Sequence, residues 1–186
     1  TPVFPPVKEI KLQDTIRITF IGDVMQHNNQ LLSALTDGGD PDNPHSYNYS
    51  STFKHIEEQL RSADIAVANM EFTLAGEPYT GYPAFSAPDS YALYLADCGF
   101  DIFLAANNHI LDKGSQGAAR TIEKYRELEK SHGIRYCGLS ADQSGIGKSH
   151  PLILNIKGIQ IALVNFTYGT NLGSDRHWPK VNYMND

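Results

Sequence analysis

Polar side chains gather directly after three short apolar segments of this 186-residue chain. They are Asp23 after the first segment, Asn69 and Glu71 after the second, and Asn108, His109 and Asp112 after the third. Carboxylate and amide oxygens with a neutral imidazole suit divalent Mn, Fe, Zn or Mg better than a soft, thiolate-binding metal. A carboxylate can bridge two such ions about 3.5–4 Å apart, and the pair then clamps the attacking and leaving oxygens of a displacement. A His beside them could protonate the leaving group.

The apolar segments are predicted strands that would bring these side chains together. Residues 15–21 are rich in β-branched side chains, and residues 64–69 and 101–107 are short buried runs. Helices are predicted between them, over residues 51–63 and 88–99. This alternation requires crossover connections and a largely parallel sheet. Because ligands bind at the carboxyl ends of the strands in open α/β folds, the polar cluster should lie at one edge of the sheet.

The alternation continues toward the C-terminus. A helix is predicted over residues 115–133, with a strand over residues 134–138 after it. Residues 151–166 have the pattern of a hairpin that turns at Lys157-Gly158. The fold class is therefore α/β, with a mixed, largely parallel sheet and flanking helices. Together these elements should cover both faces of the sheet.

The two ends of the chain differ from the middle. Residues 1–14 are predicted to be an extended, Pro-rich leader, and residues 15–186 to form the domain. Residues 167–186 have turn chemistry without periodicity, which is typical of a chain cut inside a loop. We therefore expect residues 15–186 to be the N-terminal part of a domain that is incomplete at its C-terminus.

Composition excludes some classes of function. The net charge is −6, and no basic stripe is visible, which argues against nucleic-acid binding. No apolar run is long enough to cross a bilayer. Cys98 and Cys137 lie in apolar segments and are predicted to be buried free thiols, with a disulfide as the alternative in an exported protein.

Several stretches around the polar cluster resemble one known family. They are GDVM at 22–25, ADIAVANME at 63–71, ANNHILDKG at 106–114, YTGYPAFSAPD at 79–89 and NFTYGTN at 165–171. All resemble the CapA family of capsule and poly-γ-glutamate biosynthesis proteins. The resemblance implies a calcineurin-like metallophosphatase fold, a four-layer sandwich with metals at the strand ends. It extends from about residue 16 onward.

The resemblance also assigns roles to the polar cluster. It implies that Asp23, Glu71 and Asn108 are metal ligands, with Glu71 as the bridging carboxylate. His109 matches the catalytic His, and Asp112 would support it from behind.

The chain departs from the wider superfamily at two points. Met25 stands where metallophosphoesterases usually have a metal-binding His, and the spacing of His27 differs from that of a substitute. The His-Trp-Gly-Glu and Gly-His-His-Pro-His motifs of the family's second half are not in these residues. The chain therefore carries about half of the site that the family implies.

Two functions from different classes follow from the resemblance. The first is a metal-dependent, extracytoplasmic protein of capsule or poly-γ-glutamate production, which acts on an extracellular polymer or its phospho-linked precursor. The second is a non-catalytic component that binds a polyanionic or glycan polymer, or assembles with other capsule biosynthesis proteins. A truncated sheet edge could also pair two copies into a homodimer.

Two other sequence features have competing interpretations. Residues 145–149, GIGKS, lack the first Gly of a phosphate-binding loop and are predicted to be a surface turn. A nucleotide-binding domain is disfavoured because no Gly-rich fingerprint follows the first strand. The Tyr-, Pro- and Gly-rich loop at 78–88 could be a lid or substrate wall, or its aromatic side chains could pack the loop onto the body.

Overall fold

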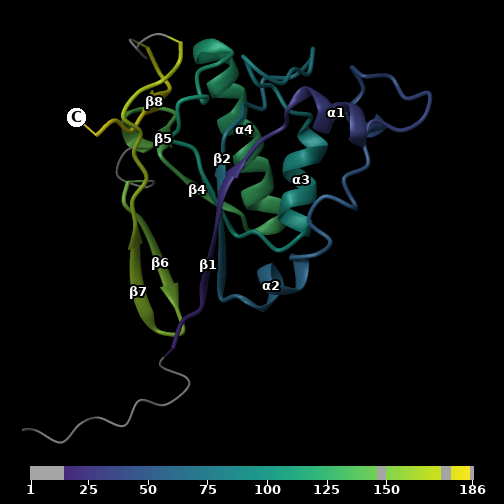
Figure 1. Cartoon of the computed structure of the whole chain (residues 1–186). Coiled ribbons are helices and arrows are strands. Elements are labelled where there is room, and N and C mark those ends of the chain that lie inside the picture. Colours follow the sequence, from purple (N-terminus) through teal and green to yellow (C-terminus); the bar gives the residue numbers. More distant parts are fainter. Residues whose placement is uncertain (1–14, 146–149, 173–176, 185–186) are drawn as a thin grey trace, which may run out of the picture.

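A four-stranded parallel sheet organises the chain. The computed structural model describes residues 15–145, 150–172 and 177–184, so the predicted leader at 1–14 and most of the 145–149 turn lie outside the described residues. The strands are β1 (Ile18–Val24), β2 (Ile65–Met70), β3 (Ile102–Leu104) and β4 (Arg135–Cys137), in that spatial order (Figure 1). All neighbouring pairs are parallel, which confirms the predicted sheet.

Helices cover one face of this sheet. They include α3 (Asp89–Asp97) and α4 (Gly114–His132), whose buried side chains share a core with Ala68 of β2 and Phe103 of β3. The predicted apolar face of α4 is confirmed, because Ile122, Tyr125 and Leu128 are all buried. Gly133 ends the helix in a left-handed conformation, which glycine adopts without steric cost.

Three short helical elements also join this layer or its loops. α2 (Glu57–Ser62) is shorter than the predicted 51–63 helix, while α1 (Asn28–Ala34) and the 3-10 turn η2 (Pro44–Ser46) were not predicted. The region around them is filled by tyrosines: the Tyr49 ring centroid lies 4.8 Å from that of Tyr91 and 5.9 Å from that of Tyr94. In the described residues no helix is long and apolar enough to cross a membrane.

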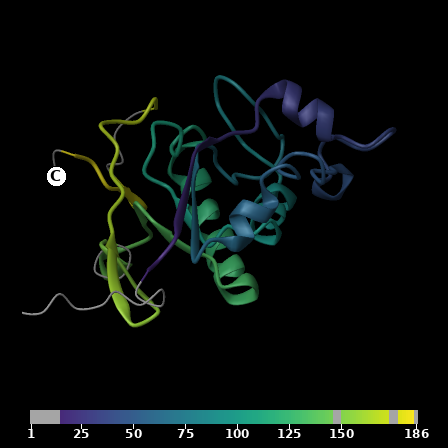
Figure 2. The same ribbon diagram turned by 60° about the horizontal axis from the view of Figure 1, so that its bottom comes forward.

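The other face of the sheet is covered by a hairpin, not by helices. The predicted hairpin is confirmed as β6 (Leu152–Ile156) and β7 (Ile159–Leu163), with a turn in which Lys157 and Gly158 both have positive φ. Figure 2 shows the hairpin and the helices on opposite sides of the sheet. Strand β7 ends at Leu163 instead of continuing to Phe166.

The hairpin covers only part of the sheet. Its inward side chains pack on Ile65, Val67, Ile102 and Cys137, which belong to β2, β3 and β4. The outer strand β1 is left uncovered, and Phe20 is 59% exposed. Cys137 lies under the hairpin, whereas Cys98 belongs to the core between the sheet and the helices. Both cysteines are buried and free, as predicted.

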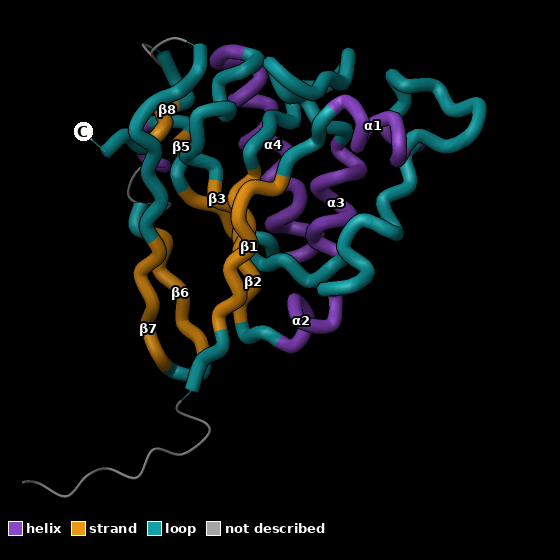
Figure 3. The backbone as a smooth tube through the Cα atoms, viewed as in Figure 1, coloured by secondary structure: helices purple, strands orange, loops and turns teal. Residues whose placement is uncertain are grey.

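A small antiparallel sheet holds part of the C-terminal stretch. It pairs β5 (Leu139–Ser140) with β8 (Lys180–Val181), and β8 lies inside the 167–186 stretch that was predicted to be irregular. The remaining connections are loops, coloured teal in Figure 3, and many gather beyond the carboxyl ends of the parallel strands. This mixed α/β arrangement, with a parallel sheet flanked by helices, is consistent with a metallophosphatase-like fold.

Candidate functional site

Amide side chains link the carboxyl ends of β1, β2 and β3. The register places Asp23 of β1 opposite Asn69 of β2, and a bulge shifts the pairing between Ile21 and Asp23. Asn69 donates from Nδ2 to Oδ1 of Asp23 at 2.8 Å, and Asn107 donates from Nδ2 to Oδ1 of Asn69 at 3.2 Å. The predicted meeting of the three strand ends is therefore present in the structure.

A buried His–Asp pair lies at the end of this chain of amides. Nδ1 of His109 and Oδ2 of Asp112 are 2.7 Å apart, and both residues are buried. The same Asp112 oxygen accepts a hydrogen bond from the backbone N–H of Phe85 at 2.8 Å. The backbone N–H of His109 donates to Oδ1 of Asn107 at 3.0 Å. The carboxylate therefore fixes both the orientation of the imidazole and the loop that lies against it.

Glu71 stands on the other side of His109 and is much less well satisfied. Its Oε1 lies 3.8 Å from Nε2 of His109, while its Oε2 is buried with no hydrogen-bond partner among the described residues. The pKa of Glu71 is raised to about 7. Burial is the largest cause, and the side chain and negative charge of Asp23 act in the same direction. A buried carboxylate oxygen without a partner is uncommon, since such groups lose their hydration and gain nothing in return.

The pair Asp23 and Glu71 fits a hard divalent cation. Such an ion prefers oxygen ligands and would supply the partner that Oε2 of Glu71 lacks. The fit is partial, because in the described part of the chain no three His, Cys, Asp or Glu side chains are grouped to hold a metal. Asn108 is turned toward Asn171, with its Nδ2 at 3.4 Å from Oδ1 of that residue. Its predicted role as a ligand stays a prediction.

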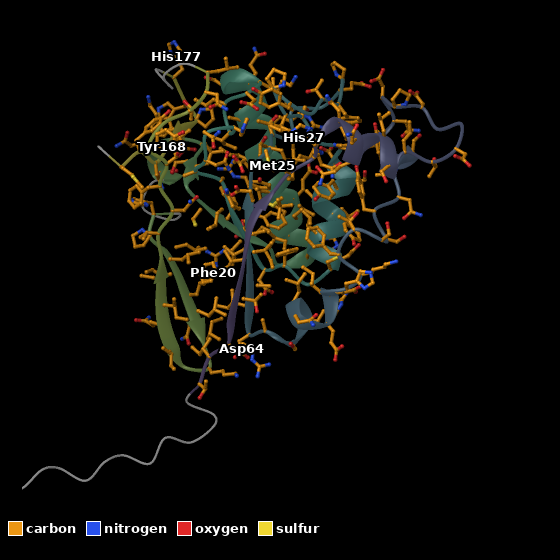
Figure 4. All side chains as sticks on the ribbon, in the orientation of Figure 1. Phe20, Met25, His27, Asp64, Tyr168 and His177 are labelled. Carbon is orange, nitrogen blue, oxygen red and sulfur yellow. The ribbon has the colours of Figure 1, made fainter. Side chains whose placement is uncertain are left out.

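Met25 and His27 lie near the position where the wider superfamily has a metal-binding His, and both contact other groups in the structure. Met25 is partly buried and packs against the helical core. His27 is exposed, and its ring stacks on Tyr82 at a centroid distance of 6.0 Å. Figure 4 places both side chains at the carboxyl end of β1, well away from Asp64 at the start of β2. The His27 ring therefore lies at the exposed edge of the site, against Tyr82.

Two asparagines that the sequence did not mark as site residues fasten the 106–109 loop from outside. Oδ1 of Asn165 accepts a hydrogen bond from the backbone N–H of Ala106 at 2.7 Å, and its Nδ2 donates to the Ala106 carbonyl at 3.3 Å. The backbone N–H of Asn171 donates to the Asn108 carbonyl at 2.8 Å. Asn165 lies near the end of the predicted hairpin over residues 151–166 and Asn171 follows it, but no local pattern marked either residue as a contact of this loop.

The side chain of Asn171 also contacts the imidazole of His109. Its Nδ2 lies 3.1 Å from Nδ1 and 3.4 Å from Nε2. Because these distances are nearly equal, the amide lies over the face of the ring instead of in its plane, where Asp112 already occupies Nδ1. The ring of Phe85 meets His109 at 4.7 Å in an edge-to-face contact. The imidazole is thus held by three neighbours, with Nε2 directed toward Glu71.

Comparison with known proteins agrees with this geometry. The profile of the family described as "Bacterial capsule synthesis protein PGA_cap" matches residues 17–186. A relative from Bacillus anthracis, named "Capsule biosynthesis protein CapA", is 22% identical over 175 residues. That alignment covers 90% of this chain and 38% of the relative, so the chain spans well under half the relative's length.

Proposed function

The chain belongs to the PGA_cap family of bacterial capsule synthesis proteins, and from this membership we propose a role in capsule or poly-γ-glutamate production at a metallophosphatase-like site. The substrate would be an extracellular polymer or its phospho-linked precursor. One observation carries the proposal: a buried His109–Asp112 pair faces Glu71, whose second carboxylate oxygen has no hydrogen-bond partner in the part of the chain that the structure describes. This arrangement combines an oriented proton carrier with an unsatisfied anionic group.

The open carboxylates are the proposed cation ligands. Asp23 and Glu71, together with Asn108, would hold divalent Mn, Fe, Zn or Mg. Such a cation supplies Lewis acidity, which polarises a phosphoryl or carbonyl oxygen. The negative charges of these two carboxylates favour binding of a cation, and the net charge of the whole chain is negative as well.

His109 would carry the proton. Asp112 holds Nδ1, so the tautomer and the direction of the ring are fixed before substrate arrives. Nε2 is the nitrogen left to act, and it faces the same space as Glu71 at 3.8 Å. A protonated Nε2 could deliver its proton to a leaving oxygen, which is ordinary general-acid catalysis.

The test is metal content, measured by elemental analysis on the full-length protein. We expect bound divalent metal in the wild type, and a loss of at least half of it in Asp23→Ala and Glu71→Gln. Asp42→Ala, which removes an exposed carboxylate far from the strand ends in sequence, should retain the metal. A metal-free wild-type protein, or unchanged metal in both site variants, would reject the catalytic proposal.

A non-catalytic polymer-binding or assembly role is the second proposal. Met25 in place of the usual His favours it, because a side chain that ligates Zn, Mn or Fe is replaced by a thioether. Under this alternative, His109→Ala leaves polymer production and polymer binding intact. If His109→Ala abolishes polymer production while binding persists, the catalytic role is favoured.

The cellular setting is proposed on the same family grounds. We place the protein outside the cytoplasm, at the cell envelope, beside other capsule biosynthesis proteins. The outer edge of β1, which stands at one end of the sheet, would also allow two copies to associate. Light scattering on the purified protein checks this association, and a clean monomer at high concentration would exclude it.

A further inference from the structure

The bulge in β1 sets the direction of Asp23. Ile21 pairs with Ala68 and Asp23 pairs with Asn69, so Gly22 is left out of the register. Ile21 packs against the helical core, and side chains two residues apart in a regular strand point to the same face. Without the extra residue, Asp23 would therefore face the helices. The bulge turns it to the opposite face, beside Asn69, and bulges often re-aim side chains in this way next to active sites.

Asn69 lies in a row where packing favours apolar side chains. Ile65 and Val67 precede it on the same face of β2 and are buried under the hairpin. Its register partner on β3, Leu104, packs against the same cluster. Asn69 itself is partly buried, and Glu71 follows two residues later. A polar side chain that interrupts such an apolar row is expected where function overrides packing.

The hydrogen bonds of the neighbouring Asn107 determine how the Asn69 amide is turned. The backbone N–H of His109 can only donate, and it bonds to Oδ1 of Asn107 at 3.0 Å. The Met70 carbonyl can only accept, and it bonds to Nδ2 of Asn107 at 2.9 Å. The same Nδ2 donates to Asn69 at 3.2 Å, so the Asn69 atom that faces it is Oδ1. Nδ2 of Asn69 is therefore the atom that donates to Oδ1 of Asp23, at 2.8 Å.

This hydrogen bond holds a carboxylate that is otherwise exposed. Asp23 lies at the surface, and a hydrogen bond from an amide to a charged oxygen is stronger than one between neutral groups. With Oδ1 held, the direction of Oδ2 is set as well. The backbone N–H of Glu71 donates to the Val24 carbonyl at 3.0 Å, which fixes the chain that carries the second carboxylate beside the first. Groups that are oriented before a ligand arrives lose less entropy when they bind it.

We propose that Asn69 is a positioning residue, which orients the Asp23 carboxylate so that Asp23 and Glu71 bind one divalent cation together. The inference deepens the proposed function and rests on it for the cation. Only a neutral group that donates and accepts at once satisfies both Asp23 and Asn107. A leucine at this position does neither, and an aspartate has no proton to donate and repels Asp23.

Isothermal titration calorimetry with Mn²⁺ on the metal-stripped, full-length protein tests the positioning. The wild type should bind Mn²⁺, and Asn69→Leu should bind it about 10–100-fold more weakly, as is typical when a group that orients a metal ligand is removed. Leucine suits the apolar row, and Asn107 keeps its bond to Met70, so the variant should fold, which circular dichroism checks. Asn155→Leu changes an exposed asparagine of β6 and is the matched control, which should stay within about twofold of the wild type.

A second background shows whether Asn69 acts through Asp23. In Asp23→Asn, the Asn69 amide would still hold the oxygen at position 23 and turn the new nitrogen toward the cation, so Mn²⁺ binding should be weak. Adding Asn69→Leu frees the amide at position 23 to turn its oxygen to the cation. The double variant should therefore bind Mn²⁺ at least as well as Asp23→Asn alone. Electron paramagnetic resonance titrations into the millimolar range compare the two, and the four proteins form a double-mutant cycle.

The outcomes separate this inference from the proposed function. Equal Mn²⁺ affinity in the wild type and Asn69→Leu would reject the positioning role and leave the cation site standing. An equal loss of affinity on Asn69→Leu in both backgrounds would also reject it, because Asn69 would then act as a ligand or through packing. A loss as large in Asn155→Leu would do the same. A wild-type protein that binds no Mn²⁺ would reject the cation site of the proposed function, and the positioning role with it.

Discussion

The two halves of the site differ in how their polar atoms are satisfied. In the closed half, Asn107, His109 and Asp112 are buried, and their side chains form hydrogen bonds within the protein. In the open half, Asp23 is exposed and one oxygen of Glu71 is buried without a hydrogen-bond partner in the described structure. Both halves belong to the same three strand ends, so the difference is not one of position in the fold.

This difference distinguishes residues that stabilise the fold from a residue whose side chain is left available to bind a ligand. Satisfied buried networks add rigidity and stability, whereas a partnerless buried carboxylate lowers the stability of the free protein. Groups kept in such a costly state are concentrated at binding and catalytic sites. Substitutions in the closed half should therefore destabilise the fold, and removal of the Glu71 charge should do the opposite.

The largest effect is expected beneath the closed half, at Gly138. Its φ is +95°, and an added Cβ would lie 2.1 Å from Oδ1 of Asn165 and 2.5 Å from the Ala106 nitrogen. Gly138→Ala should lower the free energy of unfolding by about 3 kcal/mol, because strain and a clash with backbone combine. Gly158→Ala, at positive φ but with nothing within 4 Å, should cost only about 1 kcal/mol. Urea unfolding measures both, and equal losses would contradict the role of Gly138 under the loop.

The next effect tests the closed half itself. Asp112→Ala leaves the Phe85 N–H and Nδ1 of His109 without their shared partner, and should cost about 2–3 kcal/mol in unfolding free energy. Asp112→Asn keeps an oxygen that can accept from Phe85, so its cost should be about half as large. Thermal and urea unfolding compare the two. If Asp112→Ala were as stable as the wild type, the pair would not be part of the scaffold.

The open half should respond with the opposite sign. The pKa of Glu71 is raised from 4.5 to about 7, so ionisation is less favourable in the folded than in the unfolded chain. Its contribution therefore lowers stability as pH rises from about 4.5 to 7, and the loss is complete above that range. In chelator at pH 8, Glu71→Gln should be more stable than the wild type by on the order of 2 kcal/mol, and the gain should vanish near pH 4. Urea unfolding at both pH values measures this difference. If Glu71→Gln were less stable than the wild type at pH 8, the contrast between the open and the closed half would be refuted.

The smallest effect is expected at Asn171, on the border of the two halves. Asn171→Ala removes the amide over the His109 ring but keeps the backbone bond to Asn108, so it should cost only about 1 kcal/mol. The His109 ring resonances should shift in an NMR spectrum, since the amide lies against the ring. Asn155→Ala, on the exposed side of β6, is the control and should leave those resonances in place. Unchanged resonances in both variants would show that the amide does not hold the ring.

The main elements of the fold could be predicted because their signals are local. The turn at Lys157-Gly158 and the helix over 115–133 depend on neighbours in sequence, and both are confirmed. The predicted strand at 101–107 was too long, because β3 ends at Leu104. Beyond it, Asn107 uses its side chain to bind Asn69 and Met70, and this competes with regular pairing.

The distant contacts of the site could not be predicted in the same way. The cluster at the strand ends follows from parallel topology alone, which is why Asp23, Glu71 and His109 could be grouped. The contacts of Asn165 and Asn171 depend on how a later loop folds back, which no local pattern encodes. The hairpin was predicted as an element, but which strands of the sheet it packs on also depends on distant contacts.

The two hydrogen bonds between the Asn165 side chain and Ala106 affect the order in which the site can form during synthesis. Its partner Ala106 is 59 residues earlier in the chain, and Asn171 is 62 residues after His109. At a synthesis rate of about 5–20 residues per second, the loop that carries His109 is made about 3–12 s before the residues that fasten it. During that interval the hydrogen bond between His109 and Asp112, three residues apart, can already form. Ala106 cannot yet form its hydrogen bonds, because Asn165 has not been synthesised. On the growing chain, the His109–Asp112 pair can therefore form before the loop that bears it is secured.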